Sequence, residues 1–201
     1  MRILSGEAKG RTLKTRAGKG TRPTDSRARE MLFNILGERV IEARVLDLYA
    51  GSGAVGLEAL SRGAGYCLFV EQNAGAAHAI RGNVRACGWG ERATVWQTNM
   101  KSAAHRLTAE GARFDIIFAD PPFTRPQELN DLSVRMDKWS QLLHNVGTES
   151  PALLIIQHYW KAQSELQARL SPRFTALQER RAGESMLSFF GLKPDEEAAV
   201  N

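Results

Sequence analysis

The sequence lacks the features that mark secreted, membrane-spanning and metal-binding chains. It has only two cysteines in 201 residues, Cys67 and Cys87, and they do not have the close spacing of metal ligands. No apolar run is long enough to cross a bilayer, and the N-terminus has neither the apolar run nor the cleavage site of a signal peptide. We therefore expect a cytoplasmic protein with no membrane contact, no metal and no disulfide, whose cysteines pack as small apolar side chains.

Acidic residues are scarce at the N-terminal end, which makes this end strongly basic. Residues 1–30 contain nine Lys and Arg against three Asp and Glu, a net charge of +6, whereas residues 31–201 have a net charge of −1. A concentrated basic segment on a nearly neutral body is typical of a protein that binds nucleic acid, although a solubilising tail has the same composition. The charge alone does not separate these two interpretations.

The length of the chain fits one domain with short appendages. From residue 44 onward, short apolar runs alternate with amphipathic segments, which predicts a mostly parallel sheet with helices on both faces, a doubly wound (Rossmann-like) α/β fold. We expect strands at 45–49, 66–71, 93–97, 114–119, 152–158, 174–179 and 185–190. We expect a first helix that is capped by Thr24 or Asp25 and ends near Gly37, and further helices at 54–63, 73–87, 101–110, 127–145 and 160–170. On this basis residues 1–40 form a basic arm and a helix, residues 41–192 the α/β domain, and residues 193–201 a polar, disordered tail.

A glycine-rich turn follows the first predicted strand. Gly51, Gly53 and Gly56 fit the pattern G-x-G-x-x-G that opens a helix, and Glu71 ends the next strand twenty residues after Gly51. This spacing is typical of dinucleotide-binding proteins, but Asp47 puts a carboxylate just before the turn, where it would oppose a pyrophosphate. S-adenosylmethionine has an ammonium and a sulfonium and no phosphate, so the same carboxylate would attract it. We therefore favour S-adenosylmethionine over a nicotinamide cofactor, with Glu71 at the ribose in either case.

A second motif, Asp120-Pro121-Pro122-Phe123, follows the strand predicted at 114–119. Two prolines fix φ and remove backbone donors, so the turn is rigid and presents acceptors only. If the Asp120 carboxylate and the Pro121 carbonyl each accept an N–H from a nucleobase amine, the nitrogen lone pair is oriented toward a methyl donor. Phe123 offers a flat face on which the base can stack. By itself the motif could also be only a stiff turn with a core aromatic residue.

Together these motifs resemble a known family. The two turns and Glu71 resemble class I S-adenosylmethionine-dependent methyltransferases that modify exocyclic amines. The N-terminal motifs Lys9-Gly10-Arg11, Arg22-Pro23-Thr24 and Arg27-x-Arg29-Glu30 are similar to the bacterial 16S ribosomal RNA guanine-N2 methyltransferases of the RsmD type, and the likeness runs from about residue 2 to about residue 125. This resemblance implies a seven-stranded, mostly parallel sheet with its last strand antiparallel, and it puts Asn99 at the adenine of the cofactor.

We therefore predict a monomeric enzyme that moves a methyl group from S-adenosylmethionine to guanine N2 of 16S ribosomal RNA, with an assembling small ribosomal subunit as its setting. The predicted cofactor residues are Asp47, Gly51, Gly53, Gly56, Glu71 and Asn99, and the predicted catalytic residues are Asp120, Pro121 and Phe123. The predicted phosphate contacts are Lys9, Arg11, Lys14, Arg22, Arg27 and Arg29.

Three alternatives stay open from the sequence. An adenine-N6 or cytosine-N4 methyltransferase acting on DNA would use the same Asp-Pro-Pro-aromatic turn, because the turn suits any planar amine. A nicotinamide oxidoreductase would use the glycine turn, and a non-catalytic RNA-binding protein would use only the basic arm.

Overall fold

A single sheet organises the protein. The computed structural model describes residues 1–15, 26–122, 126–143, 151–168 and 170–193. Within these residues the strands follow the order β3-β2-β1-β4-β5-β7-β6. The first five run parallel, and β7 runs antiparallel to both β5 and β6. The strands are β1 (Arg44–Leu48), β2 (Tyr66–Val70), β3 (Ala93–Trp96), β4 (Ile116–Ala119), β5 (Leu153–Tyr159), β6 (Phe174–Ala182) and β7 (Ser185–Leu192). The predicted fold class, with its antiparallel last strand, is confirmed.

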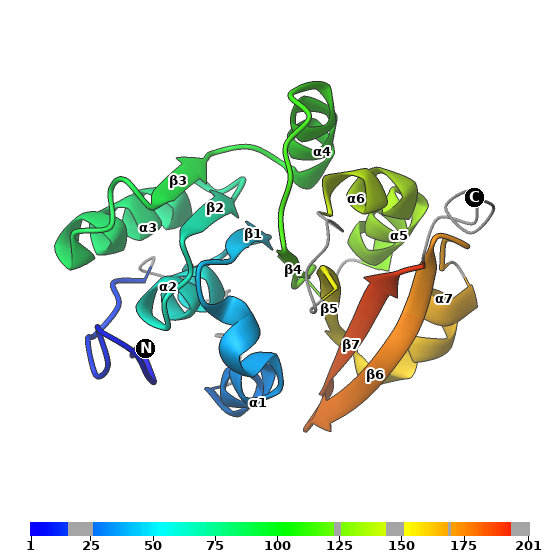
Figure 1. Ribbon diagram of the computed structural model, residues 1–201, viewed down its shortest axis with the longest axis horizontal. Coiled ribbons are helices and arrows are strands. Elements are labelled where there is room, and N and C mark those ends of the chain that lie inside the picture. Colours follow the sequence, from blue (N-terminus) through cyan, green and yellow to red (C-terminus); the bar gives the residue numbers. More distant parts are fainter. Residues whose placement is uncertain (16–25, 123–125, 144–150, 169, 194–201) are drawn as a thin grey trace, which may run out of the picture.

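Helices cover both faces of the sheet (Figure 1). One apolar cluster joins the sheet to α1 (Ser26–Leu36), η1 (Gly37–Val40), α2 (Ala54–Ser61) and α3 (Ala74–Cys87). A second cluster joins the other face to α4 (Met100–Ala109), α5 (Pro126–Val134), α6 (Met136–Leu142) and α7 (Gln163–Ala168), which follows the short η2 (Trp160–Ala162). Among the described helices, none could span a bilayer.

Side-chain alternation along β1 decides which face each residue serves. Val45 belongs to the α1–α3 cluster, whereas Leu46 and Leu48 belong to the α4–α7 cluster. Successive strand residues point to opposite faces, so Asp47 shares the face of Val45 and lies beneath α2. The Asp47 carboxylate is thereby buried between the sheet and α2.

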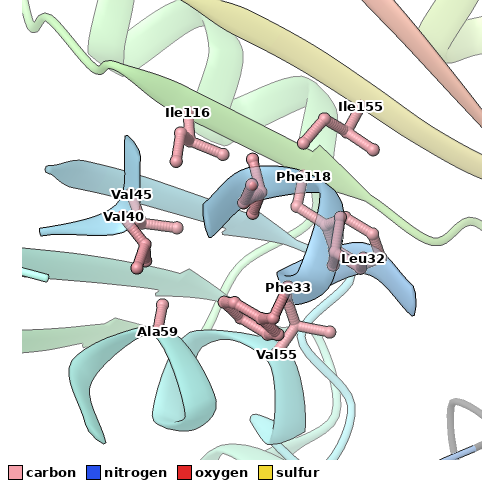
Figure 2. Close-up of a pocket in the computed structure, with 10 residues that line it drawn as sticks. Leu32, Phe33, Val40, Val45, Val55, Ala59, Ile116, Phe118 and Ile155 are labelled. Carbon is pink, nitrogen blue, oxygen red and sulfur yellow. The ribbon is translucent and has the colours of Figure 1, made fainter. Parts of the chain in front are cut away.

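The core under α1 leaves a small cavity of about 10 Å³ (Figure 2). Its lining comes from α1, η1, β1, α2, β4 and β5 and is entirely apolar. The labelled side chains in Figure 2, among them Phe33, Phe118 and Ile155, point toward one another around this space. A cavity of this size and lining holds at most one water and offers it no polar partner, so it is a packing defect and no ligand site.

The first fifteen residues pack against α2 and α3. Ile3 and Leu13 are buried in the α1–α3 cluster. The backbone N–H groups of Leu4 and Ser5 donate to the Glu58 carboxylate on α2, at 2.8 and 2.9 Å. Lys14 N–H donates to Asn83 Oδ1 on α3 at 2.8 Å, and the Asn83 amide donates back to the Lys14 carbonyl. Residues 1–15 of the predicted arm are therefore an irregular but docked segment, which we call the N-terminal segment.

Two predicted helices are divided. The helix expected at 127–145 breaks at Arg135, whose φ of −104° and ψ of 13° leave the helical region. The Leu132 carbonyl accepts the Arg135 N–H and the Trp139 indole N–H, at 3.1 and 3.2 Å, and so ends α5 before α6 begins. The helix expected at 160–170 begins instead as the 3-10 turn η2. Both predicted caps of the first helix, Thr24 and Asp25, lie outside the described residues, as do the end of the 127–145 helix and nearly all of the tail.

Candidate active site

Three polar residues leave neighbouring strands at the same edge of the sheet. The register pairs Leu48 of β1 with Val70 of β2 and with Ala119 of β4. The next residue on each strand is therefore Tyr49, Glu71 or Asp120. These three follow the carboxyl ends of parallel strands, where doubly wound folds bind their ligands.

Each of the three glycines in the turn after β1 is needed for a different structural reason. Gly51 has φ +56°, and a Cβ there would meet only the Tyr49 carbonyl, at 3.8 Å, whereas Gly53 has φ +75° and caps α2. Gly56 has ordinary helical φ, but a Cβ there would collide with the ring of Phe69 and lie 2.6 Å from Cys67 Sγ. The first two glycines shape the turn, and the third allows α2 to lie close on β2.

The N–H groups of these glycines are engaged inside the protein. Glu71 accepts the N–H groups of Gly51 and Asn73, each at 2.7 Å. Asp47 Oδ2 accepts the Gly56 N–H at 3.0 Å, and the Ala50 carbonyl accepts the Gly53 N–H at 2.7 Å. Two carboxylates therefore occupy positions at which a dinucleotide-binding turn would offer donors to a pyrophosphate.

The carboxyl group of Asp47 is strongly perturbed. Burial raises its pKa to about 7, the Gly56 N–H opposes this shift, and the nearby charges of Asp120 and Glu71 raise the pKa further. The charges of two other carboxylates therefore act on Asp47 at this edge. Negative charges held together in a poorly solvated place favour a bound cation and disfavour a phosphate.

Asn99 has a clear structural role. Its side-chain Oδ1 accepts the Ser102 N–H at 2.9 Å and so caps the N-terminus of α4. Thr98 N–H, one residue earlier, donates to the Glu71 carbonyl at 3.2 Å, which ties this cap to the end of β2. The contact of Asn99 with the adenine of the cofactor stays a prediction. The helix that Asn99 caps begins next to the carboxylate site.

The predicted base-binding turn is only partly within the described residues. Asp120 is half-buried directly after β4, and Pro121 is buried. Asp120 is close enough to Asp47 to raise its pKa, so the two motifs predicted from the sequence meet at one site. Phe123 lies outside the described residues.

Two site residues were missed by sequence reasoning. Tyr49 has φ +60°, and its hydroxyl donates to Glu128 on α5 at 3.2 Å, which links the glycine turn to the helix after the Asp120 turn. Gln157 of β5 lies level with Asp120, and its buried Oε1 has no hydrogen-bond partner among the described residues. Tyr49 stands two residues before the glycine turn and Gln157 in an apolar strand, but their closeness to Glu128 and Asp120 follows only from tertiary structure.

The predicted phosphate contacts fall into three groups. Lys9, Arg11 and Lys14 are exposed on the N-terminal segment, and Arg27 is exposed on α1. Arg22 lies outside the described residues. The prediction for Arg29 is wrong, because this side chain is 1% exposed beneath the N-terminal segment. Its guanidinium donates to the Arg2 carbonyl at 2.8 Å and lies 3.8 Å from Glu58.

Comparison with known proteins decides the family. The family model described as "Conserved hypothetical protein 95" matches residues 1–191. The chain belongs to this family. Its relatives include a Bacillus subtilis protein named "Putative rRNA methyltransferase YlbH", 35% identical over 79% of this chain and 82% of that protein. The Ribosomal RNA small subunit methyltransferase D of Escherichia coli is 39% identical over 62% of this chain and 61% of its own length. The resemblance to the RsmD type is thereby confirmed.

A solved structure supports the same membership along nearly the whole chain. It is described as "Putative methyltransferase yhhF from Escherichia coli", and it is 29% identical with a TM-score of 0.75. The superposition covers 97% of this chain and 99% of that chain. The family's methyltransferase fold therefore includes both the N-terminal segment and the β6–β7 hairpin.

Proposed function

We propose that this protein transfers a methyl group from S-adenosylmethionine to the exocyclic N2 of a guanine in 16S ribosomal RNA. The observation that carries the proposal is the meeting of Asp47, Glu71 and Asp120 at the carboxyl edge, under a turn whose glycine N–H groups are already engaged. Family membership, with relatives named as ribosomal RNA methyltransferases, supports the RNA substrate.

The residues at the glycine turn fit S-adenosylmethionine better than a dinucleotide. When bound, this cofactor supplies a methyl group on a positively charged sulfur, which leaves as a neutral thioether. Asp47 and Glu71 set a negative potential around the turn, and Gly51 lets a ligand approach the backbone. Glu71 would accept ribose hydroxyls with the lone pairs that Gly51 and Asn73 leave available. The same carboxylates argue against the nicotinamide alternative.

Asp120 and Pro121 would position the target amine. An exocyclic amine is a poor nucleophile because its lone pair is delocalised into the base. Hydrogen bonds from its two N–H groups to the Asp120 carboxylate and the Pro121 carbonyl orient the lone pair out of the ring plane. The neutral amine is too weak an acid for Asp120 to deprotonate, so the carboxylate takes the proton only after the nitrogen has become cationic. Phe123 would stack on the base.

The experiment that tests this function compares nucleic-acid substrates. Purified protein and labelled S-adenosylmethionine are incubated with small ribosomal subunits from cells that lack the protein, with naked 16S ribosomal RNA, and with duplex DNA. We expect transfer to ribosomal RNA and not to DNA, and nucleoside mass spectrometry should identify N2-methylguanosine. Methylated adenine or cytosine in the DNA sample would instead support the second candidate, a DNA amine methyltransferase.

A further inference from the structure

Aromatic and cationic side chains gather where β5 ends beside the β6–β7 hairpin. The Arg181 guanidinium lies over the Trp160 ring, 4.3 Å from its centroid, and Lys161 Nζ lies 5.5 Å from the same centroid. The Tyr159 and Trp160 rings have centroids 6.1 Å apart and are tilted by 56°. We call Tyr159, Trp160, Lys161 and Arg181 the Trp160 platform. Lys161 and Arg181 are exposed, and the two rings are half-buried.

Hydrogen bonds hold the platform in place before any ligand arrives. The backbone N–H of Trp160 donates to the Glu184 carbonyl at the hairpin turn, at 3.1 Å. Arg181 Nε donates to the Gly183 carbonyl at 2.9 Å, and this bond does not use the two terminal nitrogens of the guanidinium. The buried His158 ring bonds the Tyr159 carbonyl through Nδ1 at 2.9 Å. The stacked arginine is thus pre-organised, so it loses little freedom when it binds.

The platform lies at the same edge of the sheet as the candidate active site. Ala119 pairs with Ile156, so Asp120 is level with Gln157, and Trp160 follows three residues later. At the rise of a β-strand, this separation is about 10 Å along the chain direction. The tip of the β6–β7 hairpin also lies along the lower margin of the molecule in Figure 1, together with α1 and the N-terminal segment.

We propose that the Trp160 platform binds the single-stranded RNA next to the target nucleotide. This inference rests on the proposed function. A base that is methylated on an exocyclic amine must leave its stack, which exposes the flanking nucleotides. Aromatic faces bind such bases by stacking, and a guanidinium that is stacked on tryptophan presents its N–H edge to phosphate. The active-site turn holds the target base, and the platform binds the single-stranded RNA next to it.

Charge and stacking variants test the platform separately. Lys161→Gln with Arg181→Gln removes the two exposed charges at the Trp160 ring, Trp160→Leu removes the stacking face, and Arg181→Lys keeps the charge without the planar guanidinium. Arg106→Gln is the matched control, because Arg106 also lies over a tryptophan, Trp96, at 3.9 Å, but on α4. Each full-length variant is compared with the parent in filter binding to small ribosomal subunits from cells lacking the protein, and in methyl-transfer kinetics. Thermal unfolding checks that each variant is folded.

The expected result is weaker RNA engagement with unchanged chemistry. The Lys161/Arg181 double variant should lower the slope of log affinity against log salt by about 1.4, as for two lost contacts to single-stranded RNA. Trp160→Leu should weaken binding by about 5- to 150-fold, the range for one lost stacking contact. KM for RNA should rise while kcat at saturation stays the same, Arg181→Lys should recover part of the affinity, and Arg106→Gln should match the parent.

Two results would overturn the platform. Binding curves of the Lys161/Arg181 variant that superimpose on the parent's at every salt concentration would remove the platform from the interface. An equal loss in Arg106→Gln would show only a general effect of charge. If the parent binds the subunits but transfers no methyl group, the proposed function fails, and the binding curves still decide whether the platform contacts RNA.

Discussion

At the scale of single residues, the buried carboxyl group of Asp47 connects protonation to stability. Its pKa of about 7 in the folded protein lies well above the ordinary value near 4. Between these two values the folded state keeps a proton that the unfolded state has lost. The stabilisation is complete below about pH 4 and is lost as the pH rises through about 7.

The first prediction follows from this linkage. Unfolding in denaturant should show the parent losing roughly 4 kcal/mol between pH 4 and pH 8 through Asp47, a loss that Asp47→Asn should remove. The asparagine oxygen can still accept the Gly56 N–H, so the turn should keep its shape. Equal slopes of stability against pH in the two proteins would contradict the raised pKa.

A bound cation should ionise Asp47, so cofactor affinity should rise from pH 6 to pH 8 with release of a proton. Calorimetry in buffers of different ionisation enthalpy measures this proton release.

The second prediction concerns Asp120. Asp120→Ala should reduce the methyl-transfer rate by about 10²- to 10³-fold, the range for losing one group that acts on the transition state, while cofactor affinity changes little. Asp120→Asn keeps one acceptor oxygen and should be less impaired. Single-turnover kinetics at saturating RNA measure the effect. A wild-type rate for the alanine variant would show that Asp120 does not position the amine.

The positions that were easiest to predict from the sequence are those that follow from the spacing of strands and turns. The glycine turn, Glu71 and Asp120 were identified because parallel strands deliver their ends to one edge. Arg29 was assigned wrongly, because a basic residue in a basic segment carries no sign of burial. Its place is set by Glu58 on α2, and this partner comes from tertiary packing. Tyr49 was missed for the same reason.

At the scale of elements, the closeness of α2 to β2 depends on one glycine. The third prediction is that Gly56→Ala destabilises the protein by about 1–3 kcal/mol, because the added methyl group would collide with the Phe69 ring and Cys67 Sγ. Gly82→Ala is the matched control, since it lies within α3 and a Cβ there has no neighbour within 4 Å. This control should be neutral or stabilising by up to about 1 kcal/mol. Chemical denaturation of both variants gives the comparison, and equal stabilities would refute the packing argument.

Element boundaries were predictable where a local signal ends the element. The expected helix over 73–87 and the observed α3 nearly coincide, since Asn73 caps the start and Gly88, with φ +74°, caps the end. The break at Arg135 had no such signal, because it depends on the Trp139 indole reaching back to the Leu132 carbonyl. β6 and β7 extend to Ala182 and Leu192, beyond their expected ends, because the two strands pair along their whole length in a hairpin, from Phe174 with Leu192 to Ala182 with Ser185.

At the scale of the whole molecule, the basic side chains of the N-terminal segment belong to a segment that is docked on α2 and α3. The fourth prediction is that Lys9→Gln with Lys14→Gln flattens the salt dependence of RNA affinity by about 0.7–0.9 per lost contact, with cofactor affinity unchanged. Arg11 is left in place because its guanidinium also bonds the Ala86 carbonyl and helps to dock the segment. Arg106→Gln with Lys138→Gln removes the same charge from α4 and α6 and serves as control. Filter binding at several salt concentrations decides, and parallel lines for parent and variant would exclude the segment from the RNA interface.

The docking of the N-terminal segment also has a consequence for the order in which the protein is made. Leu4 and Ser5 bond a carboxylate that lies 54 and 53 residues later, and Lys14 bonds an amide 69 residues later. The segment is synthesised before its anchors on α2 and α3. A nascent chain that ends before Asn83 therefore carries the positive charges without the surface that arranges them. The basic surface of the segment can form only after the glycine turn has been translated.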